Sequence, residues 1–194
     1  MKNLELQKCI LGPVYTNCYF LKNKTTGEMI VIDPADFPEK IYEKVIQMGG
    51  KPAAILLTHG HFDHIMAAQA VKEKYNIPIY ACRQEEEMLR EPSVNMTAHY
   101  GKNCSIIPDV LLNDLEVFQV AGFTIQIIHT PGHTKGSCCY YIEEEDVLFS
   151  GDTVFYGSVG RTDFPGGSTA DIVRSLHKLV DSLPEETEVF PGHD

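Results

Sequence analysis

A short run of potential metal ligands lies in the first third of the sequence. Residues 58–64 read Thr-His-Gly-His-Phe-Asp-His, and the side chains that could bind a metal are those of His59, His61, Asp63 and His64. Imidazole nitrogens and carboxylate oxygens are ligands that zinc and similar divalent metals take in proteins. Because the pattern H-x-H-x-D-H rarely arises by chance in a chain of this length, it indicates a metal site.

The spacing within this run indicates two adjacent metals. His59 and His61 are two positions apart, and side chains at that separation on extended backbone point to the same side. These two imidazoles can therefore share one metal. Asp63 and His64 follow at the turn into a predicted helix, where they can face a second metal close to the first.

Three further short motifs provide additional ligands, which a pair of metals requires. They are His133 in Pro131-Gly132-His133, Asp152 in Gly151-Asp152 and His193 in Pro191-Gly192-His193. Each motif follows or ends a predicted strand, and such positions gather at one edge of a sheet, where loops form sites. A glycine beside each candidate ligand lets the backbone pass close to the metals.

The elements that must position these residues alternate between strands and helices. In the first half, strands are predicted over 17–21, 28–33 and 53–57, and helices over 38–48 and 63–75. In the second half, strands are predicted over 115–120, 124–128, 137–142, 147–150 and 188–190, with a helix over 168–182. The four strands between 115 and 150 are expected to be successive antiparallel neighbours. This periodicity by itself predicts a mixed α and β protein.

Residues 83–108 interrupt this alternation. They are polar, favour a helix over 85–90 and are irregular afterwards. We expect a lid or a surface insertion there, because long irregular segments of compact domains commonly serve as one or the other. The sequence assigns no chemistry to this segment.

Composition limits the classes of protein to which the chain can belong. Its 194 residues, 43% of them hydrophobic, suit one globular domain. The net charge of −11, from 27 acidic and 16 basic residues, argues against nucleic acid or an anionic membrane as a partner. No apolar run approaches the roughly 20 residues that span a bilayer. The N-terminus lacks the pattern of a signal peptide and no cysteine pair reads C-x-x-C, so we expect a cytoplasmic protein with reduced thiols.

The sequence resembles the metallo-β-lactamase superfamily and, within it, the short glyoxalase II-like (hydroxyacylglutathione hydrolase-like) hydrolases. Besides the histidine motif, the resemblance rests on Asn17-Cys18-Tyr19, Val31-Ile32-Asp33-Pro34, residues 130–134, Gly151-Asp152-Thr153, residues 160–167 and residues 191–193. It implies a four-layer αββα sandwich of the α/β class. The expected organisation is a single domain over 1–194, without the C-terminal helical domain of full-length glyoxalase II.

The resemblance also implies a ligand set for two divalent ions, with zinc expected and iron or manganese as alternatives. The first ion would be held by His59, His61 and His133, the second by Asp63, His64 and His193, with Asp152 bridging both. Asp63 and Asp152 are the expected catalytic carboxylates. Asp33 is similar to a carboxylate that the family places behind the site, where it could orient a ligand imidazole. Alternatively, Asp33 could cap a turn before Pro34.

The activity implied by the resemblance is hydrolysis of a small-molecule thioester, such as an S-2-hydroxyacyl thiol, by a hydroxide bridging two metals. A thiolate leaving group needs little protonation, which agrees with the lack of a dedicated acid in the motifs. A mononuclear iron persulfide dioxygenase is an alternative, because residues 160–167 resemble that branch as well. A lactone hydrolase of the same superfamily is another.

Three residues are candidates for substrate contact, namely Lys135, Tyr156 and Arg161. Lys135 follows the His133 motif, and the other two lie after Asp152. Arg161 could bind an anion, or it could pair with Asp163 and hold the loop in place. The oligomeric state does not follow from the sequence.

Overall fold

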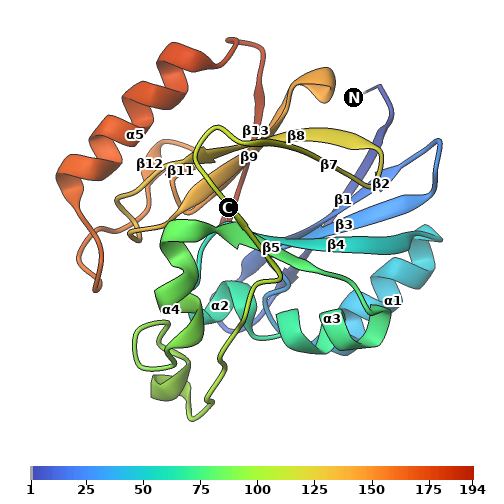
Figure 1. Cartoon of the computed structure of the whole chain (residues 1–194), viewed down its shortest axis with the longest axis horizontal. Coiled ribbons are helices and arrows are strands. Elements are labelled where there is room, and N and C mark those ends of the chain that lie inside the picture. Colours follow the sequence, from blue (N-terminus) through green and yellow to red (C-terminus); the bar gives the residue numbers. More distant parts are fainter. Residues whose placement is uncertain (1) are drawn as a thin grey trace.

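The computed structural model describes residues 2–194 and shows two β-sheets packed face to face between layers of helices (Figure 1). The first sheet contains, in spatial order, β1 (Leu4–Leu11), β2 (Thr16–Asn23), β3 (Glu28–Ile32), β4 (Lys51–Leu57), β5 (Ile79–Cys82) and β6 (Val110–Leu112). The second contains β13 (Glu188–Pro191), β10 (Val147–Gly151), β9 (Cys138–Ile142), β8 (Phe123–His129) and β7 (Val117–Val120). The predicted four-layer αββα sandwich is confirmed.

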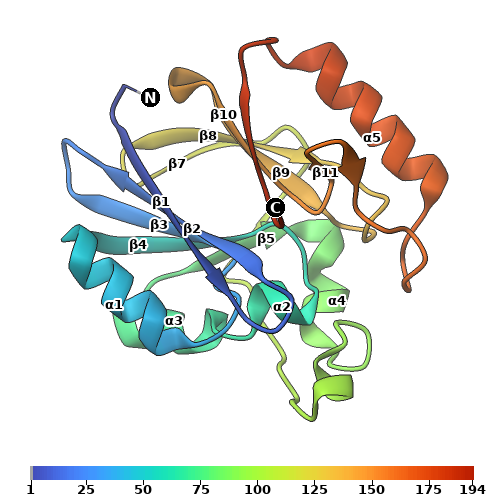
Figure 2. The same cartoon turned by 180° about the vertical axis from the view of Figure 1, so that it is seen from behind.

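The outer layers are formed by helices on both sides. On the first sheet lie α1 (Pro38–Met48), α2 (Phe62–Ile65), α3 (Ala68–Tyr75) and α4 (Glu86–Arg90), and on the second lies α5 (Thr169–Ser182), as both views show (Figures 1 and 2). The oxygen of Ser168 accepts from the amide of Asp171 and caps α5 at its N-terminus. Within residues 2–194, none of these helices combines the length and apolar character needed to cross a membrane.

The two sheets contain both antiparallel and parallel strand pairs. In the first sheet β1, β2 and β3 pair antiparallel, whereas β3 to β6 are parallel. The predicted antiparallel run of the second sheet is confirmed for β7 to β10, and β13 then joins β10 in parallel orientation. Parallel neighbours require a crossover, which α1 provides between β3 and β4, and α5 between β10 and β13.

The single helix predicted over 63–75 is wrong in detail, because the structure has two helices there. α2 ends at Ile65 and α3 begins at Ala68. The amide of Ala67 donates to the carbonyl of Pro34 at 3.0 Å instead of continuing the ladder of α2. The break therefore comes from a tertiary contact that the periodicity of the sequence does not reveal.

Several elements were not predicted at all. They are β1, β5, β6 and a two-stranded ribbon of β11 (Val154–Phe155) and β12 (Ser158–Val159). β5 and β6 have four and three residues, too few for a periodic signal. β1 carries charged and half-exposed residues along an edge of the sheet, which hides its alternation.

The hydrophobic core is divided by the two sheets. One cluster lies between them, a second lies between the first sheet and its helices, and a smaller third lies between the second sheet and α5. β4 serves the first two, because Leu56 belongs to the cluster between the sheets while Ile55 and Leu57 belong to the helix side. A strand buried on both faces reads as a continuous apolar run, as β4 does. Its rigid end is where the histidine motif begins.

Candidate metal centre

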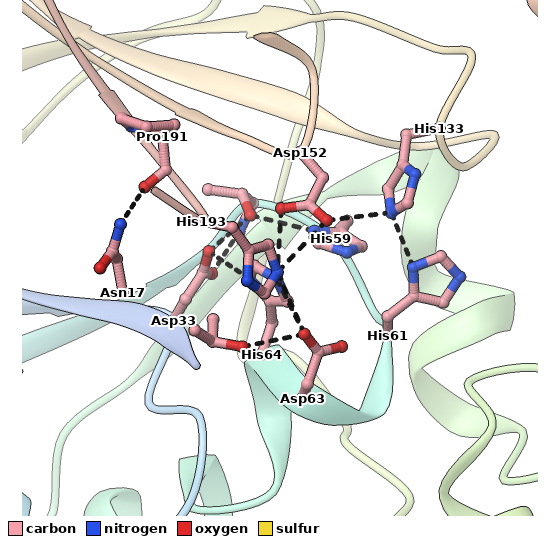
Figure 3. Close-up of polar contacts among 12 residues, drawn as sticks. Asn17, Asp33, His59, His61, Asp63, His64, His133, Asp152, Pro191 and His193 are labelled. Carbon is pink, nitrogen blue, oxygen red and sulfur yellow. Dashed lines mark hydrogen bonds and ion pairs between the residues drawn. The ribbon is translucent and has the colours of Figure 1, made fainter. Parts of the chain in front are cut away.

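The seven predicted ligands lie together at the edge where both sheets end (Figure 3). His59 and His61 follow β4, Asp63 and His64 belong to α2, His133 follows β8, Asp152 follows β10, and His193 follows β13. Six of the seven are buried, and His193 is partly buried. The end of β4 and the adjacent α2 thus supply four of these side chains, and loops after strands of the second sheet supply three.

The ligand atoms fall into groups whose members lie within 4.8 Å of one another. These groups are His59 with His61 and His133, Asp63 with His64 and His193, and His59 with His64 and Asp152. The first two are the half-sites expected from the sequence. Oδ2 of Asp152 lies 3.5 Å from Nε2 of His133 and 3.5 Å from Nε2 of His193, so this carboxylate stands between the half-sites.

Unpaired polar atoms in this cluster indicate that its residues fit metal ions. Nε2 of His59 and Oδ1 of Asp152 are buried and have no hydrogen-bond partner, and Nδ1 of His61 faces Nε2 of His133 at 2.9 Å. Buried polar atoms in proteins are nearly always satisfied, and an unsatisfied one is costly. Imidazole nitrogen and carboxylate oxygen, with no thiolate among them, suit zinc, iron or manganese.

Protonation in the cluster follows from burial and from the neighbouring charges. Burial, reinforced by the surrounding imidazoles, holds the pKa of His59 well below its ordinary value and lowers the pKa of His61 to about 3. Burial opposes ionisation of Asp63, but the adjacent imidazoles and a hydrogen bond outweigh it and lower that pKa. The pKa values of His64 and His193 are raised, because nearby carboxylates outweigh burial. Metals bind neutral imidazoles and ionised carboxylates, so the lowered pKa values of His59, His61 and Asp63 favour binding. His64 and His193, in contrast, must give up a proton when a metal binds.

Asp33 lies behind His64. Its Oδ2 is 2.8 Å from Nδ1 of His64, and the same carboxylate accepts from the amide of Thr58 at 2.8 Å and from the Thr58 hydroxyl at 2.6 Å. The geometry therefore favours the orienting role over the turn cap. With Nδ1 donating to Asp33, Nε2 of His64 is free to face the site.

Two other ligands are held by partners that the sequence did not indicate. Nδ1 of His133 lies 2.8 Å from the backbone carbonyl of Arg161, which directs Nε2 of that ring into the site. The hydroxyl of Thr16 donates to Oδ2 of Asp63 at 2.9 Å. Every residue has a backbone carbonyl, and threonines are common. Neither contact could therefore be recognised from the sequence around it.

The predicted role of glycine beside the ligands is visible at Gly151 and Gly192. Gly151 has a φ of +49°, and a Cβ there would overlap the side chain of Thr58. A Cβ at Gly192 would overlap Oδ1 of Asp152. Only glycine allows the backbone to pass this close.

A cavity of about 520 Å³ opens over the cluster. Its apolar and aromatic lining consists of Val14, Phe62, Met96, Tyr100, Phe155, Tyr156 and Phe164. Of the three candidate contact residues, Tyr156 and Arg161 line the cavity, whereas Lys135 is not among the described residues that do. Met96 and Tyr100 come from the segment 83–108, to which the sequence assigned no chemistry.

Arg161 is paired, as one of the two predicted alternatives has it. Its Nε and Nη2 each donate to the carboxylate of Asp163 at 2.7 Å, and its guanidinium lies 3.8 Å above the ring of Phe164. Among the described residues that line the cavity, Arg161 is the one lysine or arginine. The carboxylate of Asp163 offsets the positive charge of Arg161.

Known proteins resemble the chain along most of its length. The family model of the Metallo-beta-lactamase superfamily matches residues 11–193. The chain belongs to the metallo-β-lactamase superfamily. Among superfamily relatives, it is 37% identical to the probable metallo-hydrolase YqgX of Bacillus subtilis, over 98% of this chain and 90% of that protein. It is 30% identical to hydroxyacylglutathione hydrolase GloC of Haemophilus influenzae, over 84% of this chain and 78% of that one.

Solved structures of the superfamily share the fold. BLEG-1, a B3 metallo-beta-lactamase, is 38% identical with a TM-score of 0.92, covering 98% of this chain and 92% of its own. TTHA1623 in a di-iron-bound form is 34% identical with a TM-score of 0.84, covering 97% and 92%. ETHE1 from Myxococcus xanthus is 25% identical with a TM-score of 0.79, covering 98% and 76%. The protein is accordingly a metal-dependent hydrolase of this superfamily.

Proposed function

We propose that the protein hydrolyses a small-molecule thioester, such as an S-2-hydroxyacyl thiol, with the help of two divalent metal ions. The observation that carries the proposal is the pair of complete half-sites that meet at Asp152 beneath the cavity. Ions bound there would supply an activated water and polarise the substrate carbonyl.

The residues of the chain prepare this site for chemistry. Asp152 would be shared between the ions, and Asp63 is fixed by the hydroxyl of Thr16. His64 and His133 are each oriented from behind, by Asp33 and by the carbonyl of Arg161. Such outer contacts keep the ligands in place before substrate arrives. We expect zinc, and the di-iron form of TTHA1623 makes iron the next candidate.

A thioester suits the cavity for two reasons. Among the described residues that line it, none is a lysine or glutamate that could protonate a leaving group, and a thiolate leaves without such help. The aromatic lining also suits an uncharged acyl or thiol portion. The relationship to GloC, which is named a hydroxyacylglutathione hydrolase, supports the same class of substrate.

A second candidate is a persulfide dioxygenase with one iron. The similarity to ETHE1 favours it. By resemblance to that branch of the superfamily, His59, His133 and Asp152 would hold the iron. That reaction has no use for a second half-site, whereas Asp63, His64 and His193 form one here. We therefore place the hydrolase first.

The test is metal analysis of the purified protein combined with three assays. S-lactoyl glutathione is followed by thiol release, glutathione persulfide by oxygen uptake, and a lactone by acid release. We expect two ions per chain and thiol release from the thioester. One iron per chain with persulfide-dependent oxygen uptake, or turnover of the lactone alone, would overturn the proposal.

A further inference from the structure

Glu85 is a buried carboxylate that is not one of the seven ligands. It ends a short 3-10 turn, Arg83–Glu85, just before α4, and it is only 1% exposed. Glutamate is almost never fully buried unless its charge is satisfied by partners. Burial raises the pKa of Glu85 to about 7, although the hydrogen bonds that it accepts act in the opposite direction.

The partners of Glu85 are neutral donors from two separate loops. Its Oε1 accepts from the amide of Gly60 at 2.8 Å. Its Oε2 accepts from the amide of Gly136 at 2.8 Å and from the hydroxyl of Thr134 at 3.0 Å. One carboxylate therefore joins residues that are more than 70 positions apart in the sequence.

These two loops carry the ligands of one half-site. Gly60 lies between His59 and His61, and Thr134 directly follows His133. The three histidines are the group whose ligand atoms lie within 4.8 Å of one another. The carboxylate of Glu85 thus links the same two loops that a metal bound by the three histidines would link.

Glu85 and the two loops are packed tightly against each other. A Cβ at Gly136 would overlap the backbone nitrogen of Glu85, and a Cβ at Gly60 would lie 3.0 Å from Cγ of Met88 in α4. Both loops therefore use glycine to bring their amides against the turn that carries the carboxylate.

We propose that Glu85 is a positioning residue for the half-site of His59, His61 and His133, because its carboxylate fixes the separation between the two loops that carry them. The inference rests on the metal binding of the proposed function but not on the identity of the substrate. It gives the segment 83–108 a role in the metal centre.

Glu85→Gln is the informative substitution, because all three partners donate. A glutamine has one accepting oxygen, so its amide group must face either the amide of Gly60 or that of Gly136, which are themselves donors. The variant keeps the volume of the side chain and breaks one of the two links. Thr134→Val removes a single donor and provides a milder second variant.

Glu145 offers a matched control. It is another buried glutamate, 3% exposed, and it accepts from the backbone amides of Lys2 and Asn3. It lies before β10, whereas Asp152 lies after that strand. Glu145→Gln should therefore destabilise the fold without touching the metal centre.

The experiment compares wild type, Glu85→Gln, Thr134→Val and Glu145→Gln by zinc titration against a chelator and by thermal unfolding. We expect Glu85→Gln to weaken one of the two ions by about 10- to 100-fold, the range typical of residues that orient ligands. Thr134→Val should weaken the same ion less, and Glu145→Gln should lower Tm with both affinities unchanged. Equal affinities in Glu85→Gln and wild type, or a weakening of the same ion in Glu145→Gln as large as in Glu85→Gln, would overturn the inference. Wild-type protein that binds two ions and cleaves no thioester would overturn the proposed function alone.

Discussion

Asp33 holds His64 from the side opposite the metal centre. The 2.8 Å contact leaves Nε2 of His64 facing the carboxylates of Asp63 and Asp152 at 3.5 and 3.4 Å. Asp33→Asn should disturb this orientation, because both carboxylate oxygens accept hydrogen bonds and an asparagine would turn one of them into a donor. We expect catalytic efficiency to fall about 10- to 100-fold with the second ion bound more weakly. Steady-state kinetics and metal titration check this, and unchanged values would contradict the assigned role.

Removal of His193 separates the two candidate functions. The two-metal hydrolase needs this imidazole in its second half-site, whereas a one-iron enzyme does not. His193→Ala should reduce the bound metal from two ions to one and lower thioester hydrolysis by more than the roughly 100-fold effect of an outer partner. Elemental analysis and thiol release are the measurements. Asp152→Ala, which removes activity under either mechanism, serves as the reference for complete loss.

Asp163 should limit the use of anionic substrates. It neutralises Arg161 at the cavity, so Asp163→Asn leaves that guanidinium free to attract a carboxylate. We expect KM for S-lactoyl glutathione to fall about two- to fivefold, the scale of an exposed ion pair. KM for the uncharged thioester of N-acetylcysteamine should stay the same. A parallel change for both substrates would show that the effect is not electrostatic.

The buried hydroxyl of Tyr140 connects the two sheets. It donates to the carbonyl of Leu57, the last residue of β4, at 2.9 Å. Tyr140→Phe leaves that buried carbonyl without this donor and should lower the free energy of unfolding by about 1–2 kcal/mol. Tyr42→Phe, which removes a less buried bond to the carbonyl of Ala70, should cost less. Urea unfolding measures both, and a larger loss for Tyr42→Phe would refute the ranking.

Asp109 should make stability depend on acid pH. Partial burial raises its pKa, but the amide of Ile79 and the ammonium of Lys72 outweigh burial and hold the pKa below its ordinary value. Because the folded pKa is below the unfolded one, the stabilisation is complete above the unfolded value of about 3.9 and is lost as pH falls through the folded value. Asp109→Asn should therefore destabilise the protein at pH 7 and have a smaller effect near pH 2. Urea unfolding at both pH values tests the sign.

The ligands of the site could be predicted because each belongs to a short sequence motif of residues that commonly bind metals. His59, His61, Asp63 and His64 lie within six positions, and a glycine marks each of the more distant candidates. Strands with strong apolar runs, such as β4 and β9, were predicted for the same reason. Local pattern was sufficient wherever one segment carried the whole signal.

The features that were missed depend on contacts between distant segments. Glu85 reads as one acid in a polar run, and only the fold shows that it is buried between two loops. The carbonyl of Arg161 carries no side-chain signature, and the short strands β5 and β6 gain their pairing from the sheet. The exclusion of Lys135 from the cavity likewise required the path of its loop.

The division of the ligands between the two sheets has a consequence for folding. Four ligands come from the end of β4 and from α2, and three come from strands of the opposite sheet, with His193 arriving 129 positions after His64. Ions bound there would cross-link halves of the molecule that also meet through apolar packing, hydrogen bonds and the ion pair of Lys8 with Asp194. A ligand that binds only the native state shifts the unfolding equilibrium by mass action. Metal binding would therefore stabilise the docking of one half upon the other, and metal removal should lower the free energy of unfolding.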